Sequence, residues 1–567
     1  MEEFRQKIAD LLIDRLPELS KGDILDDIEI PPDKSLGDFA FPCFKLAKIY
    51  KQNPAQIATN VVDEINENEF FEKIEATGPY INFKSNLTLL SSKTLQKIQK
   101  QKEQYGYDDE GNGKTVVIDF SSPNIAKPFG FGHLRSTVIG NALSNIYDRL
   151  GYNVERINHL GDWGTQFGNL IAAYTKWGEK EKLREDPIDY LYELYVKFHE
   201  ETENDLELKD EGRKWFRKLE ESDETAVKLW KWFKDLSLQE FERIYKKLGV
   251  SFDSYKGEAF YDDKLEDTVE RIQQSGITSY SEGALIVDLS AENLPPCLIK
   301  KKDGATLYVT RDLSAAMYRF EKYKFHKALY VVGVDQELHF KQMFKVLDKM
   351  GYEWANNLEH IQFGLIKFQD GKMSTRRGNL VFLEDVLKKA QSLALDIIKE
   401  KNPDLENKEE VAEMVGVGAI IFGDLSNDRI KEVTFDWERI LDFNGETAPY
   451  LQYTHARICS ILQKAGIALE YNEKHIEQIQ SEYEKNVIQL LASYPDALKR
   501  ARNVNKPHIV ARYLLELARE FNRFYNNCPI LNENEEVKNA RLIIIDSVRQ
   551  VIVNGLAIMG IKAPKQM

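Results

Sequence analysis

The amino-acid sequence predicts a multidomain α/β protein in which a doubly wound parallel sheet lies between an α+β module and an all-α bundle. Patterns typical of buried strands alternate with helical patterns between residues 111 and 370, as expected for βαβ units. Mixed strand and helix patterns precede this region, and helical periodicity without a convincing strand follows it from about residue 411. A chain of 567 residues has room for roughly three or four domains.

Residues 1–110 are predicted to form the separate α+β module. Its opening segment, MEEFRQKIADLLIDRL, has the pattern of an acidic amphipathic helix and differs from a secretory signal. Later in the module, ATGPYINFKSN (76–86) is typical of a strand, and the stretch 87–104 is helical. A polar turn then leads into the predicted sheet.

The first strand of the sheet is predicted at residues 115–120, which are short, apolar and β-branched. A turn rich in Pro and Gly follows, and a helix with a 3.6-residue apolar period runs from about 133 to 150. Gly130 and Gly132 let the backbone approach a ligand, and the first N–H groups of the helix lack intrahelical partners. These features favour a phosphate site, although Gly-x-Gly also occurs in plain tight turns.

Polar side chains surround this turn. Lys127 and His133 lie on either side of it, and Asn124 adds an amide just beyond the strand. In open α/β sheets, ligands bind at the carboxyl ends of the strands. The turn is therefore the first candidate site.

The rest of the sheet is expected from strands at 153–160, 306–310, 328–334 and 360–368, with helices at 312–322 and 336–350. A charged helical insertion at about 176–255 separates the two halves. The basic loop DGKMSTRRGN follows the last strand. We therefore predict a Rossmann-like catalytic domain at 111–370, a signature loop with a connecting helical region at 371–440, and an α-helical domain at 441–567.

Composition narrows the possible classes of protein. The net charge of −15 argues mildly against nucleic-acid binding. Local basic strips such as 300–302 and 499–506 could still contact RNA, or could simply be solvated faces. The four cysteines are far apart, which predicts neither a structural metal nor disulfides and favours a cytoplasmic location. No apolar run approaches the roughly 20 residues that cross a bilayer, so no membrane partner is expected.

Taken together, the two candidate loops resemble the paired ATP signatures of class I aminoacyl-tRNA synthetases, a His-x-Gly-His turn and a Lys-Met-Ser-Lys-Ser loop. The segments SSPNIAKPF (121–129), GHLRST (132–137), LGDWGTQFG (160–168), YVTRDLSAAM (308–317) and YLQYTHAR (450–457) resemble arginyl-tRNA synthetases in particular. The resemblance covers essentially the whole chain.

This resemblance implies a function and a set of site residues. The implied substrates are ATP with Mg²⁺, L-arginine and an arginine tRNA, which are joined through arginyl-adenylate. The implied ATP-binding residues are Gly130, Phe131, Gly132, His133, Lys372, Met373, Ser374 and Thr375. The implied catalytic residues are Lys127, His133, Lys372 and Arg376. The implied arginine-binding residues are Asn124, Glu258, Tyr308, Asp312 and Gln336, a set of acids, amides and a phenol that suits a cationic substrate.

The resemblance also implies where tRNA binds. It assigns the anticodon to the carboxyl-terminal helical domain and the tRNA elbow to the amino-terminal module, in a monomeric protein. Tyr450 and Tyr453 could stack on unpaired bases or pack in the core, and the sequence leaves both possibilities open.

Two positions depart from the family signatures. Thr375 stands where the second lysine is usual, and Lys127 is expected to substitute for that lysine. Gly130 stands where the first histidine is usual, so a backbone amide or a neighbouring group must replace an imidazole. One alternative is therefore a catalytically weakened, synthetase-like protein that binds tRNA. A small-molecule nucleotidyl transferase fits less well, because it would have no use for the terminal helical domain.

Overall fold

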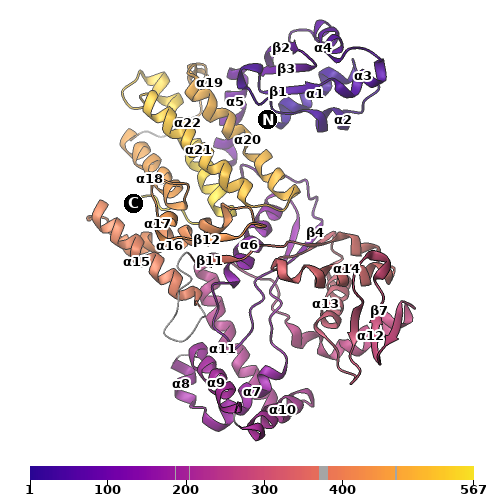
Figure 1. Ribbon diagram of the computed structural model, residues 1–567. Coiled ribbons are helices and arrows are strands. Elements are labelled where there is room, and N and C mark those ends of the chain that lie inside the picture. Colours follow the sequence, from indigo (N-terminus) through magenta and orange to yellow (C-terminus); the bar gives the residue numbers. More distant parts are fainter. Residues whose placement is uncertain (186, 204, 369–380, 467–468) are drawn as a thin grey trace. The chain divides into compact units, whose positions relative to one another are not determined.

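The computed structural model describes residues 1–567 except 186, 204, 369–380 and 467–468 (Figure 1). The chain divides into two compact units. The first comprises residues 1–106, 454–500 and 512–554, and the second comprises residues 107–453, 501–511 and 555–567. The domain boundaries at 110, 370 and 440 remain predictions.

The amino-terminal part of the first unit is α+β, as predicted. Its antiparallel sheet has the order β1 (Phe39–Pro42), β3 (Tyr80–Ser85), β2 (Phe71–Thr77). The predicted strand at 76–86 is in fact most of a hairpin, because Gly78 turns the chain at a φ of +57°. The helices are α1 (Glu2–Ile13), α2 (Lys21–Asp27), α3 (Phe44–Tyr50), α4 (Pro54–Asp63) and α5 (Leu87–Gln101), with 3₁₀ turns η1 (Lys34–Leu36) and η2 (Lys102–Gln104).

The carboxyl-terminal region is helical, as predicted. Its helices are α18 (Ala448–Ala465), α19 (Glu473–Ile476), α20 (Glu482–Asn503), α21 (His508–Asn527) and α22 (Glu535–Ile558). The apolar stripe of α21 is core, since Leu514, Leu517 and Phe521 are fully buried. Tyr450 is half-buried, whereas Tyr453 is 47% exposed and so lies largely outside the core.

The second unit contains the predicted parallel sheet. Its strands lie in the order β10 (Leu358–His360), β9 (Lys327–Tyr330), β4 (Thr115–Asp119), β5 (Asn153–Ile157), and each neighbouring pair is parallel. Helix α6 (His133–Arg149) connects β4 to β5. Because β4 has β5 on one side and β9 on the other, the order of connection reverses beside it. A ligand crevice is expected at the carboxyl end of such a strand.

Two strand predictions are wrong. Residues 306–310 open helix α13 (Tyr308–Tyr323), in which Val309, Leu313 and Met317 are buried at helical spacing, so tertiary burial overrides their local β-propensity. The segment 360–368 is split into β10 and β11 (Ile366–Phe368). Between them lies Gly364, where a Cβ atom would come within 2.8 Å of two backbone oxygens. β11 pairs with β12 (Val433–Phe435), a short strand in a region expected to be helical.

A three-stranded antiparallel sheet was not predicted either. The antiparallel strands β6 (Thr278–Ser281), β7 (Ala284–Val287) and β8 (Cys297–Lys300) follow α12 (Leu265–Gln274). Buried residues of β7 and β8 belong to one hydrophobic cluster with residues of α13 and α14 (Glu337–Lys349). Each strand has only four residues, and β7 and β8 are almost continuously apolar whereas β6 is polar, so no strand shows an alternating pattern.

The segment predicted as a helical insertion, at about 176–255, contains the helices α8 (Lys180–Glu185), α9 (Pro187–Thr202), α10 (Leu206–Glu220) and α11 (Glu224–Leu248). Helix α7 (Thr165–Trp177) precedes it. The remaining elements of the second unit are α15 (Leu383–Lys401), α16 (Lys408–Leu425), α17 (Trp437–Ile440), η3 (Glu258–Lys264), η4 (Ser290–Glu292), η5 (Val334–Gln336) and η6 (Glu353–Asn357). Among the described residues, no helix is long and apolar enough to cross a membrane.

Candidate active site

The loop that follows β4 has a strained backbone. Ser121, Ser122 and Ala126 have φ values of +72°, +48° and +59°, a region that costs a non-glycine residue about 1–3 kcal/mol. Buried hydroxyl groups hold the loop in place: the N–H of Ser121 donates to Ser136 Oγ at 2.8 Å, and that of Ala126 donates to Ser237 Oγ at 3.0 Å. Strain of this kind is typical of a functional site.

A buried ion pair supports the same edge of the sheet. Arg319 of α13 contacts Asp119, the last residue of β4, at 2.8 Å, and its side chain is 2% exposed. Its Nη2 atom also lies 3.2 Å from Nδ1 of His159, just beyond β5. The pair therefore connects the ends of two neighbouring strands to α13.

The backbone of the first signature turn forms hydrogen bonds with residues 381–383, which follow the second signature in the sequence. The N–H of Phe131 donates to Val381 O at 2.8 Å, and the N–H of Leu383 donates to Phe129 O at 2.9 Å. Gly130 and Phe382 face each other between these bonds in an antiparallel bridge. The second signature lies outside the described residues, and with it Lys372, Met373, Ser374, Thr375 and Arg376. The backbone pairing thus joins the first predicted ATP loop to residues 381–383, which follow the second in the sequence.

The amino end of α6 leaves room for a ligand. Gly132 is exposed and has a φ of −61°, and a Cβ atom there would meet nothing within 4 Å. Its backbone conformation therefore does not require glycine. A ligand bound close to the helix end would require it, because a side chain at this position would occupy the same space. The N–H groups of His133 and Leu134 donate to Gly130 O at 3.0 Å and Phe131 O at 3.1 Å. The open space at a helix N-terminus nevertheless suits an anion, because the helix dipole is positive there.

His133 is the first residue of α6, and its ring lies 5.2 Å from that of Phe129. Burial lowers the pKa of His133, and the backbone of Gly130 partly counteracts this, so the ring is neutral near pH 7. Its buried Nδ1 atom has no hydrogen-bond partner among the described residues. A buried polar atom of this kind normally has a partner, which a ligand can supply.

Two predicted arginine-binding residues form an acidic site at this edge. Asp312 Oδ2 lies 2.7 Å from His339 Nε2, and Glu258 lies 3.8 Å from Arg311. Burial raises the pKa of Glu258 to about 7; Arg311 opposes this shift, whereas Asp312 and Asp162 add to it. A bound cation would relieve both the burial penalty and the mutual repulsion.

The GDWG segment (161–164) positions Glu258. The N–H of Glu258 donates to Leu160 O at 2.9 Å, and the N–H of Ala259 donates to Asp162 Oδ1 at 2.8 Å. The other carboxylate oxygen of Asp162, a fully buried side chain, contacts Lys234 of α11 at 2.6 Å. The motif LGDWGTQFG indicates the family but does not by itself assign these roles to Asp162 and Lys234.

The other predicted arginine-binding residues lie at the same edge or on adjoining helices. Asn124 is exposed and lies close against Gly161. A side chain at position 161 would collide with it, because a Cβ atom there would lie 2.1 Å from Asn124 Oδ1. Gln336 is exposed at the end of η5, shortly after β9. Tyr308 is 70% exposed and lies one helical turn before Asp312 on α13, hence on the same face. Sequence reasoning missed His159 and His339, although His339 lies only three residues beyond Gln336.

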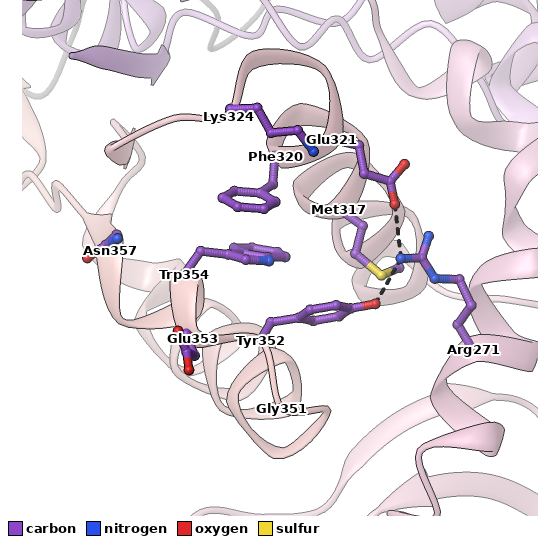
Figure 2. Close-up of a pocket in the computed structure, with 10 residues that line it drawn as sticks. All are labelled: Arg271, Met317, Phe320, Glu321, Lys324, Gly351, Tyr352, Glu353, Trp354 and Asn357. Carbon is purple, nitrogen blue, oxygen red and sulfur yellow. Dashed lines mark hydrogen bonds and ion pairs between the residues drawn. The ribbon is translucent and has the colours of Figure 1, made fainter.

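A cavity of about 680 Å³ in the same unit lies at the opposite end of the sheet (Figure 2). Its lining includes Lys324, just before β9, and Asn357, just before β10, so it lies at the amino ends of these strands. None of the predicted site residues that the structure describes lines it. We therefore assign the ligand crevice to the carboxyl edge.

Comparisons with known proteins show the family of the chain. The family "tRNA synthetases class I (R), catalytic domain" matches residues 94–437, "Arginyl tRNA synthetase N terminal domain" matches 2–85, and "DALR anticodon binding domain" matches 451–567. The arginine–tRNA ligase of Halothermothrix orenii is 47% identical over 570 residues, and that of Clostridioides difficile is 48% identical over 567. Both alignments cover 100% of each chain.

Solved structures confirm the predicted fold class. The arginyl-tRNA synthetase of Thermus thermophilus matches with a TM-score of 0.85 at 24% identity, covering 99% of this chain and 100% of that one. The enzyme of Plasmodium falciparum matches with a TM-score of 0.84 at 24% identity, covering 100% and 99%. The architecture, the site and the full-length sequence identity lead to one conclusion: the chain belongs to the arginyl-tRNA synthetase family.

Proposed function

We propose that this protein ligates L-arginine to its cognate tRNA, using ATP and releasing AMP and pyrophosphate. The identity to arginine–tRNA ligases over the full chain supports this reaction. The observation that carries the substrate assignment is the acidic site of Glu258 and Asp312, which lies at the same sheet edge as the open amino end of α6. The site thus offers a place for a cation beside a place for phosphates.

ATP enters with Mg²⁺ as a substrate complex. The amides of Gly130 and Gly132 at the amino end of α6 would bind its phosphates, with Phe131 beside them and its own N–H donated to Val381 O. The Nδ1 atom of His133, which has no partner among the described residues, would hydrogen-bond the nucleotide. We assign the contacts that close on pyrophosphate to the second signature, with Lys372 and Arg376 in catalytic roles and Met373, Ser374 and Thr375 beside ATP.

The first step needs no protein nucleophile. A carboxylate oxygen of arginine attacks the α-phosphorus of ATP, and the bond to the β-phosphate bridging oxygen breaks to release pyrophosphate. A terminal ribose hydroxyl of tRNA then attacks the arginyl carbonyl carbon, and AMP leaves. Positioning and stabilisation of phosphate charge therefore account for catalysis.

The acidic site would bind the positive groups of arginine. Asp312 and Glu258 are suited to charge-assisted hydrogen bonds with a guanidinium or an ammonium group. Asn124 and Gln336 supply amides, and Tyr308 supplies a hydroxyl on the helix face of Asp312. Arginine would restore the ionised form of Glu258, because a nearby positive charge lowers a carboxyl pKa.

Neighbouring groups would compensate for both departures from the family signatures. Lys127 would provide the positive charge that Thr375 lacks, and backbone amides would replace the missing imidazole at position 130. A hydrogen bond to a charged group is worth about 1.5–3 kcal/mol, so the Gly130→His variant reports how far this compensation goes.

We also propose which domains bind the anticodon and the elbow of tRNA. The anticodon would bind the carboxyl-terminal helical domain, in line with the family description that matches residues 451–567. The tRNA elbow would bind the amino-terminal module of a monomeric enzyme. We propose a cytoplasmic location, because none of the four cysteines, all of which the structure describes, forms a disulfide.

The decisive assay is arginine-dependent ATP–pyrophosphate exchange, with and without arginine tRNA, followed by tRNA charging. We expect exchange and charging with arginine, and neither with lysine. The Gly130→His variant, assayed beside the parent, is expected to match or exceed its rate. Binding of tRNA without exchange or charging would instead identify a catalytically weakened tRNA-binding protein.

A further inference from the structure

Helix α9 of the insertion carries aromatic rings on one face. Tyr192, Tyr195 and His199 are spaced three and four residues apart, so they follow one another along the helix. The rings of Tyr195 and His199 lie 4.4 Å apart at 66°. Tyr192 and Tyr195 are half-buried although the insertion is otherwise highly charged. We call these three residues the aromatic face.

The aromatic face contacts the first ATP loop through Lys127. The Nζ atom of Lys127 lies 4.9 Å from the centre of the Tyr195 ring, within the range of a cation–π interaction. In the described part of the chain, Lys127 makes no ion pair with a carboxylate. Burial lowers the pKa of Lys127, and its charge also contributes to lowering the pKa of His199. The ring of Tyr195 is thus the partner that holds the ammonium group.

The same face contacts the chain that leaves the second ATP loop. The ring of Tyr192 lies 6.3 Å from that of Phe382 in an edge-to-face arrangement at 89°. Phe382 is bridged to Gly130 of the first signature. Helix α9 therefore contacts Lys127, which lies just before this backbone pairing, and Phe382, which lies within it.

A cavity of about 510 Å³ lies beside these contacts. It is lined by Ile188 at the start of α9, by Pro128 and Phe129 of the first loop, and by Phe382. The Tyr192 and Tyr195 contacts therefore join the helix to the loops beside a region that protein atoms do not fill.

We propose that Tyr195 is a positioning residue for adenylate formation, and that its ring holds the ammonium group of Lys127 beside the ATP turn. This inference rests on the proposed function of the site. An aromatic face attracts an ammonium group without cancelling its charge, whereas a carboxylate would neutralise it and compete with phosphate. Helix α9 thereby gives the insertion a role in ATP binding, with Tyr192 steadying the segment that follows the second signature.

The test compares Tyr195→Leu, which removes the ring, with Tyr195→Phe, which keeps its face. Trp177→Leu is the matched control, because it removes the ring that lies 4.5 Å from Lys197 of the same helix. The assay is ATP–pyrophosphate exchange on the full chain with arginine and tRNA. For Tyr195→Leu we expect kcat/KM for ATP to fall about threefold to tenfold, while KM for arginine stays unchanged. Tyr195→Phe and Trp177→Leu are expected to remain within twofold of the parent.

A double variant tests whether Tyr195 acts through Lys127. In the Lys127→Met background, we expect Tyr195→Leu to cause no further loss, because the contact is already absent. If Tyr195→Leu fails to fold, Tyr195→Met provides the same comparison.

The outcomes separate the two proposals. A parent enzyme without any exchange would overturn the proposed function. An active parent whose ring-less Tyr195 variant keeps the parental kcat/KM for ATP would overturn the role of Tyr195 alone. So would equal losses in the Tyr195→Leu and Trp177→Leu enzymes, or full additivity with Lys127→Met.

Discussion

The two ends of the parallel sheet contrast in how well their polar groups are satisfied. At the carboxyl end, the loop after β4 is strained, the Nδ1 of His133 lacks a partner among the described residues, and the pKa of Glu258 is raised to about 7. At the amino end, Arg271 binds both Glu321 and Tyr352, and the rings of Phe320 and Trp354 stack 4.8 Å apart (Figure 2). Polar groups that fold without their partners indicate a ligand more reliably than the size of a cavity does.

The topology of the sheet explains the contrast. Each parallel strand ends at the same edge, where loops and helix N-termini present unpaired N–H groups. The amino ends receive the carboxyl ends of helices, which the chain can pack and pair by itself. Substitutions at the two ends of the sheet should therefore differ in their effect on activity.

Asp312→Asn should cause the largest loss of activity. It removes the negative charge that would hold a positive group of arginine, and we expect kcat/KM for arginine to fall about 100-fold. ATP–pyrophosphate exchange measures the loss. Glu321→Gln at the amino end is the matched control and should stay within twofold of the parent. A loss below threefold for the Asp312 variant would exclude a direct contact with the substrate.

His133→Ala should lower exchange by about 10-fold, which corresponds to the loss of a hydrogen bond to a charged phosphate worth about 1.5 kcal/mol. Because the Nδ1 atom has no partner to lose among the described residues, the thermal midpoint should change little. Kinetics and thermal unfolding of the same preparation check both statements. A large fall in the midpoint with unchanged kinetics would assign the histidine to stability instead.

Arginine affinity should depend on pH through Glu258. With a pKa of about 7 this carboxyl is mostly protonated at pH 6 and mostly ionised at pH 8. A guanidinium or ammonium group binds the ionised form, so affinity should rise about tenfold between these pH values. Calorimetric titration with arginine measures it, and Glu258→Gln should flatten the profile. A slope that survives in the Gln variant would assign the dependence to another group.

The same carboxyl should influence stability in the opposite direction. The folded protein holds its proton up to about pH 7, whereas the unfolded chain releases it near the ordinary value of 4.5. The contribution of Glu258 to the free energy of unfolding therefore falls as pH rises between these values. Urea unfolding at pH 5 and pH 8 should show a smaller decrease for Glu258→Gln than for the parent.

Arg271→Met at the amino end should have the smallest effect on activity. It removes the hydrogen bond to Tyr352 at 2.8 Å and the ion pair with Glu321 at 3.0 Å. Because this side chain is 32% exposed, we expect a loss of about 1 kcal/mol in the free energy of unfolding. Exchange activity should stay within twofold. A strong loss of activity in a folded variant would show that the two ends of the sheet are coupled.

Local patterns in the sequence correctly predicted the strand and the helix on either side of the ATP turn. The apolar run at 115–120 and the helical period from 133 correspond to β4 and α6, because burial on both faces of a strand and on one face of a helix leaves periodic traces. The same reasoning was wrong at 306–310. Those residues look like a strand by local propensity, yet the cluster around α13 buries them at helical spacing.

The sequence by itself determined the fold class, the family and the identity of the candidate residues, since these depend on local periodicity and on short motifs. Only the tertiary structure decided how those residues are supported. Asp162 contacts Lys234 and the turn at Glu258, and Tyr195 meets Lys127 from a distant helix. Such contacts join segments that are far apart in the chain, and a burial pattern records that a residue is covered without recording which residue covers it.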